Sequence, residues 1–208
     1  MPFELGRPIG VPGDPDFQNR VITAALELLD APSGPVLQDY LEDALPVEGP
    51  AALMCPVSFA LPEADDSDSA KLTAKLLEEI ALMRPWYDRS VDNRKRTTVG
   101  ASGLALESMG SFVGEFLDGG IPESKGDVNS PSLFKLVIED LKAYYFESAT
   151  AQPGQEEADS KTLTAWFYRE TVAGSVLYAV GDAHKDTQDK SMRLVVNTLL
   201  IPRSQRLN

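Results

Sequence analysis

The sequence has very little cysteine and histidine, with one of each among 208 residues. Cys55 has no second cysteine with which to form a disulfide inside the chain, which is typical of proteins kept in a reducing cytoplasm. His184 would have to support a Ser-His-Asp triad or a histidine-based metal site alone, so the sequence favours neither. We therefore expect a cytoplasmic protein that holds no metal and no cofactor.

Acidic residues outnumber basic residues in this chain, and the chain has no long run of apolar residues. The 19 Lys and Arg residues stand against 32 Asp and Glu, which gives a formal net charge of −13. The negative electrostatic field of such a charge repels phosphate groups and anionic lipids, so we expect neither a nucleic-acid partner nor a membrane partner. No apolar run approaches the ~20 residues needed to span a bilayer. The first residues also lack the basic and apolar regions of a secretory signal.

Apolar residues recur at helical spacing along most of the chain, which predicts a mainly α-helical fold. Asp14 and Ser130 each precede a proline, a pattern that predicts a helix N-cap followed by proline in the first turn. Pro85 should kink or end its helix, although Tyr87 could continue the same apolar stripe. The expected stripes fall within residues 17–29, 72–83, 109–117, 133–145, 163–180 and 192–200.

Two short segments near the N-terminus are strand candidates. Residues 36–37 form one, and the apolar run at residues 51–55 has the pattern of a strand buried on both faces. We therefore expect a small α/β portion near the N-terminus, so that the fold is α+β at most. Residues 1–62 would form this strand-helix-strand portion, completing an α/β domain, and residues 63–208 would form a helical domain.

The segment from Arg94 to Gly103 is a candidate anion site. A basic cluster at residues 94–96 precedes a small-residue turn, and backbone N–H groups at the start of a helix beside arginines can bind an anion. The ending Gly-Lys-Ser/Thr of a P-loop is missing. The alternative to an anion site is a purely structural tight turn that leads into a capped helix. The candidate substrate or anion ligands are Arg96, Thr97, Thr98, Gly100 and Ser102.

Other chemically interesting residues have ordinary structural interpretations. Cys55 ends an apolar run, so a small buried core residue is more typical there than a reactive thiol. His184 lies near the end of a predicted helix, where we expect either a surface residue or one that interacts with the dipole at the helix C-terminus. The aromatic groups at residues 86–87 and 144–146 are more typical of a core than of a binding cage. The sequence therefore predicts no catalytic residue.

Several segments together resemble one protein family. The chain resembles the C-terminal half of proteins similar to selenoprotein B of the glycine, betaine, sarcosine and D-proline reductases. The resemblance covers nearly the whole chain. It rests on LGRPIGVP at residues 5–12, on residues 20–29, on CPVSF at 55–59, on RPWY at 84–87, on RTTVG at 96–100 and on residues 141–154.

The resemblance implies a half-protein. In this family a selenocysteine or cysteine attacks the carbon next to nitrogen in a small amino acid or betaine, and that nucleophile lies in a segment N-terminal to the part that matches here. Cys55 matches a position with no established catalytic role in the family. The resemblance thus implies a partner chain, the N-terminal reductase half, or alternatively a homo-oligomer.

Three hypotheses follow from the sequence. In the first, the chain is a subunit of a reductase-like oxidoreductase that shapes the substrate pocket while the partner supplies the thiol or selenol. In the second, it is a non-catalytic helical binding or scaffolding protein that retains the fold. The third, a stand-alone enzyme acting through Cys55, has the least support.

Overall fold

A computed structural model describes residues 9–10, 13–42, 69–124, 126–153 and 158–206. These residues contain seven α-helices and no strand, which confirms the mainly helical prediction. The strand candidate at residues 51–55 lies outside them. The chain divides into two compact units, Met1–Glu48 and Gly49–Asn208, and each is described by itself. None of the helices in the described part is long and apolar enough to cross a membrane.

The N-terminal unit is built on helix α1, Pro15–Glu27, which runs into a 3₁₀ turn at Leu28–Asp30. The Asp14 carboxylate accepts a hydrogen bond from the backbone N–H of Phe17 at 3.0 Å. This satisfies one of the free N–H groups at the start of the helix and confirms the predicted N-cap. α1 buries only two of its side chains, Phe17 and Val21.

The strand prediction for residues 36–37 is wrong. The chain from residue 35 to residue 42 has no strand structure. It is tied to α1 by side chains, through an ion pair between Arg20 and Glu42 at 2.6 Å and an edge contact between the Phe17 and Tyr40 rings. A strand needs a neighbour to complete its hydrogen bonds, and the described residues of this unit provide none.

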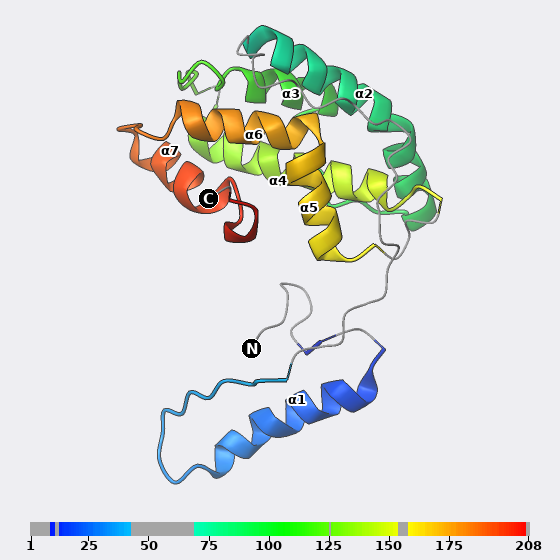
Figure 1. The fold of residues 1–208 in the computed structure, drawn as a ribbon, viewed down its shortest axis with the longest axis vertical. Helices are drawn as coiled ribbons and strands as arrows, with labels where there is room; N and C mark the ends of the chain where they lie inside the picture. The colour runs from blue at the N-terminus through cyan, green and yellow to red at the C-terminus, as the bar shows by residue number, and fades with distance from the viewer. Residues whose placement is uncertain (1–8, 11–12, 43–68, 125, 154–157, 207–208) are drawn as a thin grey trace. The chain divides into compact units, whose positions relative to one another are not determined.

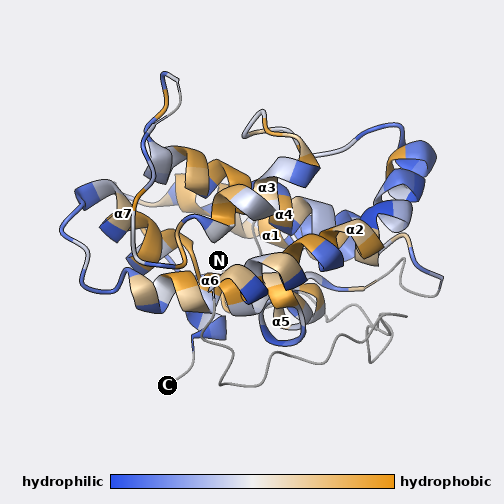
Figure 2. Cartoon of the chain, turned by 90° about the horizontal axis from the view of Figure 1, so that it is seen from above, coloured by the Kyte–Doolittle hydropathy of each residue, from blue (hydrophilic) through white to orange (hydrophobic). Residues whose placement is uncertain are grey.

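In the larger unit α4 is the central helix and contacts α2, α3, α5 and α7. α2 also lies beside α3 and α6, as Figure 1 shows. Hydrophobic residues run along α3 and α6 (Figure 2), and the side chains between the helices form one continuous core. The helices are α2 (Ser69–Arg94), α3 (Leu106–Gly114), α4 (Ser130–Ala149), α5 (Ser160–Glu170), α6 (Val172–Ala183) and α7 (Lys190–Leu194), with a π-helical turn at Val195–Leu199.

Proline and capping residues place the helix boundaries slightly differently from the predictions. α2 continues past Pro85, and its ribbon bends in its second half (Figure 1). The N-cap of α4 is Asn129 rather than Ser130, and its side chain accepts from the N–H of Ser132 at 2.9 Å. Because Asn is as good a cap as Ser, the helix starts one residue earlier.

The single long helix predicted over residues 163–180 is two helices. α5 ends at Glu170, and Thr171 has an extended backbone conformation. The Thr171 hydroxyl accepts from the N–H of Gly174 at 3.0 Å and so caps α6. The apolar spacing continues across the break because both helices pack on the same core, so the spacing alone did not reveal it.

Candidate functional site

The predicted anion-binding segment is a turn that follows α2. Lys95 has a left-handed backbone conformation with φ of 54°, and Gly100 and Gly103 have φ of 132° and 70°. Glycine adopts positive φ without the steric cost that other residues carry. The N–H of Gly103 donates to the carbonyl of Gly100 at 3.2 Å and closes the turn. This conformation directs the N–H groups of Thr98, Gly100, Ala101 and Ser102 toward α4.

The carboxylate of Asp140 on α4 fills the concave side of this turn. Its Oδ1 accepts from the N–H groups of Gly100 and Ala101, both at 2.9 Å. Its Oδ2 accepts from the N–H of Ser102 at 2.8 Å and from the Ser102 hydroxyl at 2.6 Å. Successive backbone N–H groups arranged in this way form an anion-binding nest. The anion in the nest is therefore a side chain of the same chain.

A second carboxylate of α4 binds the beginning of the segment. Glu147 Oε1 accepts from both the N–H and the hydroxyl of Thr98 at 2.8 Å, and Oε2 accepts from the Thr97 hydroxyl, also at 2.8 Å. Asp140 and Glu147 are seven residues apart, which places them two turns apart on one face of the helix. The two acids together attach the whole turn to α4.

Burial and hydrogen bonding act in opposite directions on Asp140, whose side chain is almost fully buried. Burial disfavours the ionised form, but the hydrogen bonds from Ser102, Gly100 and Ala101 outweigh it and lower the pKa of the Asp140 carboxyl below its usual value. The carboxylate is therefore ionised at neutral pH and holds its four donors.

Four of the five predicted ligands come together around these acids. Thr97 and Thr98 bind Glu147, while Gly100 and Ser102 bind Asp140. The Arg96 side chain is exposed and makes no ion pair with the described residues. Sequence reasoning missed both acids. The available signal was their position in α4, because Asp140 and Glu147 fall in the apolar stripe that continues through Val137 and Tyr144.

A third buried acid, Glu79 on α2, binds the N-terminus of α6. Its two oxygens accept from the N–H groups of Val172 and Ala173 at 3.0 Å, and the Tyr145 hydroxyl donates to Oε2 at 2.6 Å. Burial raises the pKa of the Glu79 carboxyl, although these three hydrogen bonds oppose the rise. A negative charge at the N-terminus of a helix also interacts favourably with the helix dipole. Glu79 thus joins three helices of the core.

His184 occupies the C-cap of α6, as its position near a helix end predicted, but its expected surface location is wrong. The side chain is buried, and its Nε2 donates to the carbonyl of Phe116 at 2.9 Å. The ring satisfies a carbonyl of the turn after α3, so packing between distant segments decides its burial. The predicted core role is confirmed for Tyr87, Tyr144 and Tyr145, and half-buried Phe146 packs against that core. Trp86 is half-buried and is not part of the core.

The described residues form no metal site and include no cysteine. No group of three or more His, Cys, Asp or Glu residues is placed there to hold a metal ion. Cys55 lies outside the described residues, so both its predicted burial and its alternative role as a thiol stay predictions. No protein-family model, curated protein sequence or solved structure matches the chain.

Proposed function

We propose that this chain is a helical subunit that acts by binding a second protein chain and has no complete active site of its own. The observation that carries this proposal is the exposure of large apolar side chains in the N-terminal unit. The exposed fractions are 58% for Leu26, 79% for Leu29, 99% for Leu37 and 90% for Leu41. Large apolar side chains that gather on a protein surface mark interaction sites.

The small size of the N-terminal core supports the same proposal. α1 buries Phe17 and Val21, and the turn that follows it buries none of its residues. Burying a large apolar side chain contributes about 1.5–3 kcal/mol, so covering the four leucines would add at least as much as α1 gains from its two buried residues. A second chain laid against this surface would supply that burial.

The role of the buried acids argues against an independent active site in the larger unit. Glu79, Asp140 and Glu147 each accept hydrogen bonds that hold one helix or turn against another. A substrate carboxylate at the turn would have to displace Asp140 from four donors. The turn is thus better suited to fixing the fold than to exchanging a substrate.

The sequence resemblance supports a specific form of the proposal. In that form the partner is the nucleophile-bearing half of a reductase of the glycine, betaine, sarcosine and D-proline type, and this chain contributes the helical wall of the shared pocket. In the alternative form the chain is a non-catalytic scaffold for another protein. An adjacent gene encoding an α/β half with a cysteine or selenocysteine motif would favour the reductase form.

Molar mass in solution tests the proposal. We expect light scattering at micromolar concentration to give more than the monomer mass, either for the chain alone or after addition of the purified α/β half. Leu26→Glu combined with Leu29→Glu should abolish this association, because a buried charge without a partner is strongly unfavourable. Leu194→Glu is the matched control, since Leu194 is 59% exposed but belongs to α7 in the other unit.

The outcomes separate the forms of the proposal. A homo-oligomer or a complex with the α/β half supports partner binding, and only the complex supports the reductase form. Circular dichroism should show unchanged helix content in all variants. A chain that stays monomeric both alone and with that half would overturn the reductase form and the homo-oligomer, and would leave the scaffold form.

A further inference from the structure

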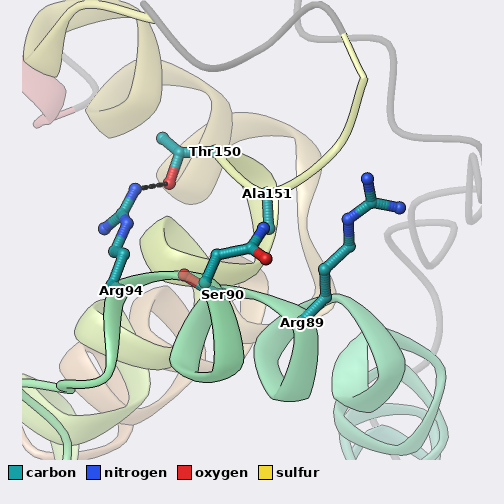
Figure 3. Close-up of a pocket in the computed structure, with 6 residues that line it drawn as sticks. Arg89, Ser90, Arg94, Thr150 and Ala151 are labelled. Atoms are coloured by element: carbon teal, nitrogen blue, oxygen red, sulfur yellow. Dashed lines mark hydrogen bonds between the residues drawn. The ribbon is translucent and has the colours of Figure 1, made fainter.

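A polar hollow lies on the larger unit between the last turns of α2 and the end of α4. Its volume is about 220 Å³, and it is separate from the turn held by Asp140. Figure 3 shows Arg94 and Arg89 extending from α2 on either side of Ser90, with Arg94 reaching the Thr150 hydroxyl and Arg89 extending away from it along the other edge of the hollow. The lining residues are Arg89, Ser90, Asn93, Arg94, Thr150 and Ala151.

Ser90 gives this hollow an unsatisfied polar group. Its side chain is 2% exposed, yet its hydroxyl has no hydrogen-bond partner, which is true of no other buried side-chain atom in the described residues. Serine and threonine in a helix commonly donate to the carbonyl four residues earlier, as Ser148 and Thr150 do here. Leaving a buried hydroxyl unpaired costs free energy, so a ligand that pairs with it gains a favourable interaction.

The two arginines beside Ser90 carry charge that no residue in the described ranges neutralises. Arg94 donates to the Thr150 hydroxyl at 2.8 Å, and the Arg89 guanidinium lies 5.9 Å from the Trp86 ring centre. Neither forms an ion pair with a described residue. The acids of this part of α2 have other partners, since Asp88 pairs with Arg84 and Asp92 with Lys95. In a chain of net charge −13, two neighbouring arginines that lack an acidic partner among the described residues are a specific local feature.

Helical spacing places these donors in two neighbouring rows along the end of α2. Arg89 and Asn93 are four residues apart, as are Ser90 and Arg94, so each pair lies in neighbouring turns of one helix face. The hydrogen bond to Thr150 restrains the Arg94 guanidinium. The Arg89 guanidinium lies beside the Trp86 ring. A planar guanidinium presents paired N–H groups that match the oxygens of a carboxylate or phosphate.

We propose that this hollow is a binding site for a small oxyanion, either a carboxylate or a phosphate group. Arg89 and Arg94 bind the anion oxygens, and the Ser90 hydroxyl donates from the base of the hollow. The site does not depend on partner binding through the N-terminal unit. It also differs from the predicted anion site, where Asp140 already occupies the donors.

Calorimetric titration of the full chain with inorganic phosphate, acetate and chloride at equal ionic strength tests the site. We expect saturable binding of phosphate, acetate or both, and weaker binding of chloride. Binding of phosphate alone assigns the site to phosphate groups, and binding of acetate alone assigns it to carboxylates. The association-defective Leu26→Glu, Leu29→Glu variant should bind the anion as the native chain does, so the two proposals fail separately.

Substitutions locate the anion. Arg94→Gln should weaken binding by about tenfold or more, the value of one charge-assisted hydrogen bond. Ser90→Ala should weaken binding without reducing stability, because the hydroxyl has no partner to lose. Arg193→Gln is the matched control, with the same charge change at an exposed arginine of α7, and should have no effect.

Three results would overturn this inference. They are binding no tighter than that of chloride, equal weakening by Arg193→Gln and Arg94→Gln, and loss of binding in Arg96→Gln but not in Arg94→Gln. The last result would place the anion at the turn after α2.

Discussion

The Asp140 carboxylate accepts both the backbone N–H and the hydroxyl of Ser102, at 2.8 Å and 2.6 Å, across 38 residues of sequence. Together with the N–H groups of Gly100 and Ala101, these contacts make the turn after α2 a recognition site for a side chain of α4. The turn therefore has the anion-binding chemistry that its sequence predicted, but uses it within the fold. This arrangement leads to the first two predictions.

Asp140→Asn should lower the free energy of unfolding by about 2 kcal/mol, because an amide NH₂ would face N–H donors where an acceptor is needed. Denaturation in urea measures the change. Asp118→Asn is the control, since Asp118 is exposed and has no such bonds. Equal stability of the two variants would show that the turn is not held by the Asp140 charge.

Protonation of Asp140 at low pH should weaken its hold on the turn after α2. The folded-state pKa of Asp140 is lowered from 3.8, so its contribution to stability is complete above pH 3.8 and is lost as the pH falls through the folded-state pKa. We expect the stability difference between the native chain and Asp140→Asn to shrink below about pH 4. A difference that stays constant down to pH 2 would contradict this assignment.

Glu79→Ala should be among the most damaging single substitutions. It leaves the N–H groups of Val172 and Ala173 and the Tyr145 hydroxyl without their acceptor inside the core. We expect a loss of about 3 kcal/mol or more in the free energy of unfolding. The neighbouring Glu78 is exposed, so Glu78→Ala should change it by less than about 0.5 kcal/mol. Similar losses in both variants would contradict the buried bridge.

Two glycines of α6 should respond to alanine in opposite ways. A Cβ at Gly174 would lie 2.3 Å from the Phe167 carbonyl oxygen and 2.7 Å from that of Tyr168, so Gly174→Ala should destabilise the fold by about 2–3 kcal/mol. At Gly181 the nearest atom, Leu200 Cδ2, is 3.5 Å away. Gly181→Ala should therefore stabilise α6 by about 0.5–1 kcal/mol. Thermal unfolding of both variants checks the contrast, and the same sign for both would contradict it.

Local signals in the sequence accounted for most helix positions. Asp14 before Pro15 identified the start of α1, and the apolar stripes located the core faces of α2, α4 and α6. These signals succeed because capping and amphipathic spacing act within one or two turns of a helix. The same range limits them. The strand expected at residues 36–37 had no partner, and the break at Thr171 did not interrupt the apolar spacing.

The sequence by itself determined that this is an acidic, mainly helical chain whose turn after α2 can bind an anion. Only the tertiary structure decided which anion is bound there, because Asp140 reaches that turn from another helix. Long-range packing likewise placed Glu79 at the start of α6, buried His184, and left the Ser90 hydroxyl unpaired beside two arginines. A contact between segments tens of residues apart depends on how whole helices pack, so residue spacing can indicate that an acid lies on a buried face but not which segment it binds.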